Sequence, residues 1–343
     1  MKKVMIHRPG GLQRLVIEET PAPAPNAGEV CVRVSHAGVN FADLVVRMGL
    51  YPSAKEYVGW PITPGFEFAG TIESVGADVG SFHTGDRVVG VTRFGGYAER
   101  ICVAPAQLVA LPDAISLADA AGFPVAFLTA WYALHELCRL RPGHRVLVHS
   151  AAGGVGGALV QLAKRAGAHV VAVVGAPEKV AVAEAAGADC VIDKSRSELW
   201  PAAERAAPDG FHVVLDANGA ETLRESYRHL RSTGRLVIYG FHTMLKRGSD
   251  RLDLFRAAIG WLRTPRFDPM AMVNHNKAVL CFNLSYLFDE LPLFQEAMIE
   301  LMSALARGEL RAPSVTHVPF GDVREAHRLL HSGKTVGKVV LDM

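Results

Sequence analysis

Apolar and polar residues alternate along much of the first 120 residues of this chain. In the segment 29–37, Val30, Val32 and Val34 alternate with more polar neighbours, which indicates a strand with one buried face. Several other short apolar runs follow the same pattern and are separated by glycines. The further strands predicted in this way are 4–6, 15–18, 68–75, 86–91 and 97–103. Many short strands with glycine turns predict a barrel-like β domain.

The period changes near residue 117. Residues 117–140 carry apolar groups at helical spacing, interrupted near Gly122 and Pro124, and strands then alternate with helices to about residue 240. Such alternation predicts a parallel sheet with helices on both faces. The predicted strands are 145–149, 169–174, 191–192, 213–216 and 235–239, and the predicted helices are 158–166, 178–186 and 222–230.

The last part of the chain mixes both periods. Residues 277–286 are predicted as a strand, and 296–307 as an amphipathic helix that stops at Gly308. The remaining elements are expected to return to the first domain and complete it. They are a helix at 323–330 and strands at 315–319 and 338–341.

The length of 343 residues, half of them hydrophobic, favours two domains. We expect one domain from 1–126 completed by 289–343, and a second from 127–288. The second domain carries a less regular insertion at 241–275, where five arginines lie among apolar and aromatic residues. Arginine interleaved with aromatic residues fits a membrane surface, and a lid or a dimer-packing element is the alternative interpretation.

A buried strand, a turn of small residues and a helix follow one another within 146–165. This arrangement holds a dinucleotide pyrophosphate at a helix N-terminus. Gly154 is expected to let the backbone approach the phosphates, and Gly157 to let the helix pack on the strand. Ala152 replaces the first glycine of the usual fingerprint. A small-residue turn without a ligand is the alternative.

The next predicted strand, 169–174, ends at Gly175 without the acidic residue that binds the ribose 2′-hydroxyl in enzymes that prefer NAD. Lys179 and Lys194 lie nearby and suit a 2′-phosphate, so the sequence favours NADPH. A solvated charge is the alternative for each lysine. Two nearby acids are interpreted as turn residues: Asp189 and Asp193.

The charge balance excludes some partners. There are 36 basic and 34 acidic side chains, a net charge of +2, and no Lys/Arg block, so no nucleic acid is expected. No apolar run approaches the roughly 20 residues that span a bilayer, and no secretory signal is recognised. The five cysteines are scattered, which fits reduced thiols and a cytoplasmic protein.

Several short motifs, in order along nearly the whole chain, resemble the zinc-free quinone oxidoreductases of the zeta-crystallin type, within the medium-chain dehydrogenase/reductase superfamily. They are 38–43, 49–52, 64–70, 85–88, 151–156 and 337–341. Three further segments are similar to the branch of vesicle amine transport protein homologues: 40–44, 241–275 and 278–286. The resemblance implies a Rossmann doubly wound parallel sheet and a GroES-like β-barrel catalytic domain.

Zinc members of this superfamily hold their catalytic metal with a Cys and a His in the early motifs. Here the Cys position is Asn40 or Phe41, and the His position is Phe66. Glu67 remains, but one carboxylate does not hold a catalytic zinc. No cluster of four cysteines surrounds 93–97. We therefore expect no metal.

A metal-free enzyme of this type is expected to deliver hydride to a quinone or to a C=C bond conjugated to a carbonyl. By resemblance, Asn40 and Tyr51 are catalytic residues near the nicotinamide, and Thr129 also lies near it. Arg47 carries a charge that suits an anionic acceptor, and Arg47 and Thr129 are assigned to substrate binding. Each has a structural alternative. Asn40 caps a turn, Tyr51 is a packed aromatic, Arg47 is a solvent-facing charge and Thr129 is an ordinary helix residue.

The resemblance also implies the cofactor contacts. The residues implied for NADPH are Asn40, Thr129, Gly153, Gly154, Val155, Gly156, Gly175, Lys179, Lys194, Tyr239, Gly240, Phe282, Leu284 and Lys338. For Lys338, a surface lysine at a strand end is the alternative. Where relatives often carry a tyrosine, this chain has Lys194.

The leading interpretation is an NADPH:quinone oxidoreductase or enone reductase without zinc. One alternative is a cofactor-bound partner of membranes or proteins with vestigial turnover. Another is an enoyl-thioester reductase of a biosynthetic pathway. By resemblance, 277–286 is the edge strand through which relatives pair, so a homodimer is expected.

Overall fold

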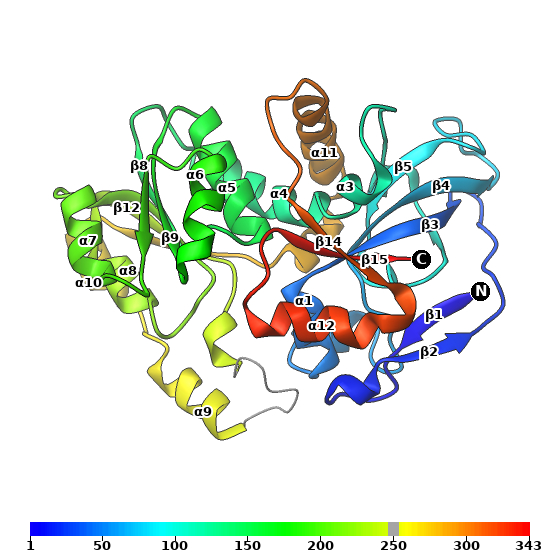
Figure 1. The fold of residues 1–343 in the computed structure, drawn as a ribbon, viewed down its shortest axis with the longest axis horizontal. Helices are drawn as coiled ribbons and strands as arrows, with labels where there is room; N and C mark the ends of the chain where they lie inside the picture. The colour runs from blue at the N-terminus through cyan, green and yellow to red at the C-terminus, as the bar shows by residue number, and fades with distance from the viewer. Residues whose placement is uncertain (246–253) are drawn as a thin grey trace. The chain divides into compact units, whose positions relative to one another are not determined.

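The computed structural model describes residues 1–245 and 254–343, which form two compact units (Figure 1). Unit 1 comprises Met1–Leu128 and Leu284–Met343. Unit 2 comprises 129–245 and 254–283. Strands from the tail join the sheet of unit 1.

Unit 1 is built around a seven-stranded sheet of order β14-β15-β3-β4-β5-β7, with β6 paired to β3. The tail strands join in two ways: β14 runs parallel to β15, and β15 runs antiparallel to β3. The short strand β7 is absent from the sequence prediction. The strands of this sheet are β3 (Val30–Val39), β4 (Glu67–Val75), β5 (Arg87–Val91), β6 (Arg100–Val103), β7 (Leu108–Ala110), β14 (Val315–Pro319) and β15 (Lys338–Asp342); β1 (Lys2–Met5) and β2 (Val16–Glu19) form a separate pair.

The strand β3 contributes to two cores. Its first half packs Val30, Val32 and Val34 into one apolar cluster, as the alternation predicted. Its second half packs Ala37 and Val39 into another. The pairing of β3 with β4 shifts register between these halves. A bulge re-aims the side chains that follow it, which lets one strand serve both cores.

Helices cover this sheet, and Figure 1 shows α1 and α12 packed together. The helices that begin or lie in unit 1 are α1 (Phe41–Arg47), α2 (Pro52–Tyr57), α3 (Leu117–Ala121), α4 (Pro124–Trp131), α11 (Leu291–Ala306) and α12 (Val323–Ser332); its 3-10 turns are η1 (Leu12–Arg14), η2 (Pro105–Gln107), η6 (Leu284–Asp289) and η7 (Phe320–Asp322).

Unit 2 contains a six-stranded sheet of order β10-β9-β8-β11-β12-β13, in which every described pairing is parallel. In chain order this is the 3-2-1-4-5-6 arrangement of a dinucleotide-binding fold. The predicted doubly wound sheet is therefore confirmed. The strands are β8 (Arg145–Val148), β9 (His169–Val174), β10 (Cys190–Asp193), β11 (Phe211–Asp216), β12 (Leu230–Ile238) and β13 (Ala278–Cys281).

Helices α5 and α6 lie on one face of this sheet, and α7 and α8 on the other (Figure 1). Helix α7 was not predicted, and the predicted strand 277–286 is too long, because residues after Cys281 leave the sheet. The helical elements are η3 (Tyr132–Leu137), α5 (Gly154–Arg165), η4 (Pro177–Lys179), α6 (Val180–Ala185), α7 (Leu199–Ala206), α8 (Leu223–Arg228), η5 (His242–Met244), α9 (Leu254–Arg263) and α10 (Pro269–His275).

Candidate functional site

The glycine-rich turn joins β8 to α5 in unit 2. Gly153 caps the helix, and the first hydrogen bond along the helix runs from the Gly157 N–H to the Gly153 carbonyl, at 2.8 Å. The N–H groups of residues 154–156 precede that bond and point out of the helix N-terminus, where an anion is favoured. The turn therefore has the geometry that the sequence predicted for a pyrophosphate.

The close approach of helix and strand falls on a different glycine from the predicted one. A Cβ on Gly156 would lie 2.3 Å from the Ser150 carbonyl oxygen and 2.7 Å from Ala151 Cα. At Gly157 the nearest atom would be 3.8 Å away. The prediction that Gly157 is the packing glycine is wrong, because only position 156 meets backbone below contact distance.

The turn lies at the point where the strand order of the sheet reverses. Strand β8 has β9 on one side and β11 on the other, and the chain leaves β8 at its carboxyl end. Open α/β sheets bind ligands outside the carboxyl ends of the strands at such a switch point. The predicted residues Gly153, Gly154, Val155 and Gly156 all lie here.

The end of β9 carries the residues predicted for a 2′-phosphate. A Cβ on Gly175 would lie 3.6 Å from Cε of Lys194, so the side chain of that lysine reaches the strand end. Lys179 follows at the end of η4. The two nearby acids have other partners, and Asp193 ends β10 rather than lying in a turn. Asp193 accepts hydrogen bonds from the Ser195 backbone and hydroxyl, and Asp189 pairs with Lys164 at 2.7 Å.

The aromatic residues predicted near the nicotinamide come together at the ends of β12 and β13. The ring of Phe282 lies 5.0 Å from that of Tyr132 and 6.4 Å from that of Tyr239, measured between centroids. Burial, and the nearby Asp216, raise the pKa of Tyr239. Gly240 follows directly, and Thr129 is buried on α4.

A buried polar network at this switch point escaped the sequence analysis. Asp216 ends β11, and its Oδ2 accepts hydrogen bonds from Thr222 Oγ1 at 2.6 Å and from Ser226 Oγ at 2.8 Å. His149 Nε2 lies 3.0 Å from Ser226 Oγ, and burial lowers the pKa of His149. All four residues are buried. Their one visible signal was polar residues directly after two apolar strands.

Unit 1 contains a buried group of three polar side chains. Lys338 Nζ donates to Asn40 Oδ1 and to Glu67 Oε1, each at 2.6 Å, and Asn40 Nδ2 donates to the same Glu67 oxygen at 2.8 Å. Glu67 is fully buried, and its Oε2 accepts the Val125 N–H at 2.7 Å. The predicted residues Asn40 and Lys338 are thus brought together by Glu67. The surface-lysine alternative for Lys338 is wrong, because its residue is 5% exposed.

Asn40 begins α1 as its N-terminal cap, but its side-chain amide is turned to Glu67 and Lys338. Gly38 is what makes room for this arrangement. A Cβ at Gly38 would lie 2.3 Å from Glu67 Oε1 and 2.4 Å from the Ala121 carbonyl oxygen. A side chain at position 38 would therefore displace the carboxylate.

Tyr51 packs against the residue that stands at the metal-ligand position. Its ring meets Phe66 edge-on at 5.7 Å and Phe94 at 6.5 Å, and Phe66 and Phe94 lie 5.4 Å apart. Tyr51 is half-buried and caps α2. Phe66 thus fills with an aromatic ring the position where a zinc enzyme carries histidine.

A carboxyl group supports the base of α1. Asp43 is fully buried and accepts hydrogen bonds from the N–H groups of Asn40 and Gly65, both at 2.8 Å, and from the Tyr97 hydroxyl at 3.0 Å. Burial raises the pKa of Asp43 to about 7, although these donors oppose the rise. The start of the helix that carries Asn40 is therefore held by a carboxyl group that titrates near neutrality.

Arg47, at the end of the same helix, is completely buried. The expectation of a solvent-facing charge is wrong. With no exposed surface, the guanidinium is also poorly placed to attract an acceptor from solution. The charge of Arg47 acts inside the protein. After burial, it is the next cause of the lowered pKa of His327 on α12.

Leu284 begins η6, which is tied to α2 within unit 1. Ser285 Oγ lies 2.8 Å from Ser53 Oγ, and the Ser285 carbonyl accepts from Arg93 Nε at 3.2 Å. The Arg93 guanidinium also lies 3.7 Å from the centroid of the Tyr57 ring. These contacts fix the segment directly after Leu284.

Among residues 1–245 and 254–343, one group of His and Asp side chains has metal-ligand spacing. His36, His317 and Asp342 place one ligand atom each within 4.8 Å of one another. They come from β3, β14 and β15. This group does not include Asn40, Phe66 or Glu67, the residues at the early metal-ligand positions.

Comparison with known proteins gives a consistent result. The family model described as alcohol dehydrogenase GroES-like domain matches residues 26–113, and the one described as zinc-binding dehydrogenase matches residues 154–268. The synaptic vesicle membrane protein VAT-1 homolog of Rattus norvegicus is 33% identical over 335 residues, which cover 97% of this chain and 81% of that protein.

Solved structures agree over the whole chain. The Escherichia coli quinone oxidoreductase complexed with NADPH has a TM-score of 0.86 at 28% identity and covers 100% of both chains. The CurK enoyl reductase has a TM-score of 0.86 at 29% identity, covering 100% of this chain and 99% of that one.

Proposed function

Because this chain belongs to the medium-chain dehydrogenase/reductase superfamily, we propose that it transfers hydride from NADPH to a quinone or an α,β-unsaturated carbonyl compound without a catalytic metal. The observation that favours a metal-free reaction is that both carboxylate oxygens of Glu67 already have hydrogen-bond donors. Its Oε1 is held by Lys338 and Asn40, and its Oε2 by the Val125 N–H. An ammonium group thus neutralises the one carboxylate left at the early metal-ligand positions.

The residues of unit 2 fit NADPH. The N-terminus of α5 offers free N–H groups to a pyrophosphate, and Gly156 permits the tight turn that presents them. Lys194 reaches Gly175 at the end of β9, where a 2′-phosphate is expected, and Lys179 follows on η4. The similar E. coli quinone oxidoreductase is complexed with NADPH. NADPH is therefore the cofactor that these residues suit.

NADPH, when bound, supplies the hydride and its electron pair. A carbonyl or quinone oxygen gains negative charge as it accepts them, and a hydrogen-bond donor stabilises that charge. Two of the three N–H groups of Lys338 are committed to Asn40 and Glu67. We propose that Asn40 and Lys338 form a rigid polar surface beside the acceptor. The Tyr51 hydroxyl then donates a hydrogen bond to the acceptor oxygen.

Purified protein tests this directly. NADPH oxidation should be faster with a quinone such as p-benzoquinone, or with an enone such as 3-buten-2-one, than with simple aldehydes. The reverse reaction with primary alcohols and NADP⁺ should be negligible. Equal or better turnover of alcohols would refute the proposal. A Tyr51→Phe variant should lose kcat with enones while retaining its affinity for NADPH.

A second candidate, reduction of an enoyl thioester, is favoured by the similarity to the CurK enoyl reductase. It uses the same hydride transfer to a conjugated C=C bond. Comparing crotonyl-CoA with 3-buten-2-one in the same assay separates the two. A much larger kcat/KM for the thioester would select this candidate.

Membrane-surface or protein docking is the other alternative, and exposed apolar residues on α9 and α10 favour it. Trp261 is 64% exposed and Leu262 73%, and Met270 and Val273 are each 78% exposed. Arg247, Arg251 and Leu252 of the predicted arginine-rich insertion lie outside the described residues. No helix in the described part of the chain is long and apolar enough to cross a membrane.

Flotation of the protein with anionic liposomes tests this alternative. A Trp261→Ser/Leu262→Ser variant should then float less than the parent protein. Absence of flotation for both would reject membrane docking.

We also propose a homodimer that pairs through β13. Among the strands of residues 1–245 and 254–343, β13 is the last of the unit 2 sheet, so one of its edges is unpaired there. An edge strand of this kind offers N–H and C=O groups to a second copy. Sedimentation equilibrium should give twice the chain mass of 36.9 kDa. A Val279→Pro substitution should shift the protein towards monomer.

A further inference from the structure

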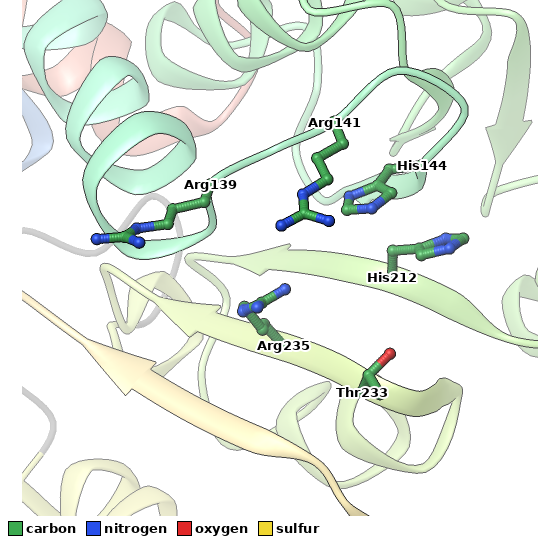
Figure 2. A pocket seen from close by; sticks show the side chains of 6 residues that line it. All are labelled: Arg139, Arg141, His144, His212, Thr233 and Arg235. Atoms are coloured by element: carbon green, nitrogen blue, oxygen red, sulfur yellow. The ribbon is translucent and has the colours of Figure 1, made fainter.

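Unit 2 has a cavity at the end of its sheet opposite to the glycine-rich turn. The cavity has a volume of about 360 Å³. Figure 2 shows the side chains that line it, from the loop before β8, from β11 and from β12. They are Arg139, Arg141, His144, His212, Thr233 and Arg235.

The position separates this cavity from the cofactor turn. His144 precedes β8 and His212 is the second residue of β11, so the cavity opens at the amino ends of the parallel strands. The turn at Gly153 follows the carboxyl end of β8. Four strand residues lie between them, which is about 13 Å of strand.

The lining is positively charged and lacks a counter-charge. It contains three arginines, and none of its described members is a carboxylate. No ion pair joins Arg139, Arg141 or Arg235 to an acid within residues 1–245 and 254–343. In Figure 2 the guanidinium groups of Arg141 and Arg235 extend towards the same space. Uncompensated like charges that converge on one cavity favour an anion there.

The hydrogen bonds of His212 also favour an additional acceptor at this place. Its Nδ1 accepts the Arg145 backbone N–H at 3.0 Å, so in the neutral ring the proton sits on Nε2. That N–H faces Arg231 Nη1 at 3.1 Å, and a guanidinium nitrogen is also a donor. Two donors therefore face each other. An oxygen acceptor placed beside them would satisfy both.

The two histidines of the lining, His144 and His212, both have lowered pKa values. Their rings stack with centroids 4.4 Å apart and planes 12° from parallel. Burial, together with smaller contributions from His144, Arg231 and Arg145, lowers the pKa of His212 to about 4. Burial also lowers the pKa of His144, with added contributions from Arg235, Arg141 and Arg231. Both rings are therefore neutral at pH 7, and the positive charge of the cavity belongs to arginine.

The backbone is strained at two lining positions. Arg139 has φ of 46° and Thr233 has φ of 69°, both in the left-handed region that β-branched residues rarely enter. Strain of this kind persists where the surrounding structure enforces it, and it is enriched at ligand sites.

We propose that this cavity is a binding site for a small phosphorylated anion, distinct from the NADPH site. Guanidinium groups match the spacing of phosphate oxygens with paired N–H donors. The Thr233 hydroxyl adds a neutral donor. A cavity of about 360 Å³ fits a small molecule better than a nucleic acid strand.

Isothermal titration calorimetry with pyrophosphate tests the proposal, at constant chloride, with the protein alone and with the protein saturated with NADPH. With NADPH occupying the glycine-rich turn we expect one site. The protein alone should show the same site with the same affinity, besides any binding of pyrophosphate at that turn. Arg141→Gln and Arg235→Gln should each weaken binding at least about tenfold, as expected for a lost charge-assisted hydrogen bond. Arg224→Gln, a change of an exposed arginine on α8, is the matched control and should have no effect.

Other anions identify what the site recognises. Tighter binding of glycerol 3-phosphate than of inorganic phosphate would indicate a phosphate ester, and equal binding would indicate free phosphate; both support the site. The His212 ring nitrogens should also shift in ¹⁵N NMR spectra on addition of pyrophosphate. Absence of binding, loss of binding on NADPH addition, or equal weakening by Arg224→Gln would overturn the proposal.

Discussion

Lys338 and Glu67 are 271 positions apart in the sequence, yet the ammonium nitrogen of one lies 2.6 Å from a carboxylate oxygen of the other. The side chains are 6% and 0% exposed. Asn40 bonds to both and thereby has a fixed amide orientation. Two of the positions that by resemblance hold a metal in zinc relatives, Asn40 and Glu67, thus form a closed polar group with Lys338.

Lys338→Met should destabilise the protein by about 3–5 kcal/mol, because it leaves a buried carboxylate without its counter-charge. The free energy of unfolding from urea titration measures this. The double variant Glu67→Gln/Lys338→Met should recover part of the loss. Lys334→Met, at an exposed lysine on the preceding loop, is the control. A loss no greater than that of the control would contradict a buried ion pair.

Gly156→Ala should weaken NADPH binding at least about tenfold, because the new methyl would meet the Ser150 carbonyl at 2.3 Å and distort the turn. Gly157→Ala, one residue later, has room for the methyl and should bind NADPH normally. It should also gain up to about 1 kcal/mol in stability from helix propensity. Fluorescence titration with NADPH compares the two. The opposite ranking would restore Gly157 as the packing glycine.

Lys194→Ala and Lys179→Ala should each raise the KM for NADPH about tenfold, as the loss of a charge-assisted hydrogen bond predicts. The KM for NADH should stay unchanged, because NADH has no 2′-phosphate. Lys55→Ala, at an exposed lysine of unit 1, serves as the control. Equal increases in the KM for NADPH and for NADH would show that these lysines do not bind the 2′-phosphate.

Stability should depend on pH through Asp43, whose pKa is raised to about 7 by burial. Between about pH 4 and pH 7 the unfolded chain ionises this group while the folded protein keeps it protonated. Its contribution to stability is therefore complete below pH 4 and falls as pH rises, on the order of 4 kcal/mol in total. Asp43→Asn should remove this dependence. Urea titrations of both proteins at several pH values should show their stabilities diverging with pH. Parallel curves would contradict the raised pKa.

Dialysis against EDTA should leave quinone reduction unchanged. Any zinc found by elemental analysis has a candidate site away from Glu67, because His36, His317 and Asp342 have metal-ligand spacing. His317→Ala should remove zinc bound there without altering activity. Activity that falls with EDTA in both proteins would show that a metal acts in the reaction.

The sequence predicted the features that depend on local pattern. The alternation of Val30, Val32 and Val34 placed β3. The small-residue turn indicated a helix after β8, although the helix begins at Gly154, four residues before the predicted start. Both follow from the periods of strand and helix, which need no knowledge of tertiary contacts. The order of strands and helices in unit 2 then gave the parallel sheet.

What the sequence did not predict depends on tertiary contacts. Whether residue 156 or 157 meets the strand is set by the angle of α5, and the pattern of glycines alone does not contain it. Arg47 has the sequence context of a surface helix residue, yet packing places it in the interior. The partners of Asp216 come from another strand and from α8, so the polar network was not foreseeable from spacing.

The chain order of the two units implies a nested order of assembly. The described residues of unit 2, 129–245 and 254–283, lie between Leu128 and Leu284 of unit 1, so its sheet can form from nearby segments. The sheet of unit 1 closes only when β15 docks on β3 after the whole intervening unit has been synthesised. Contacts so distant in sequence slow folding. Lys338 lies on that closing strand, so the polar group around Glu67 forms only when β15 has docked.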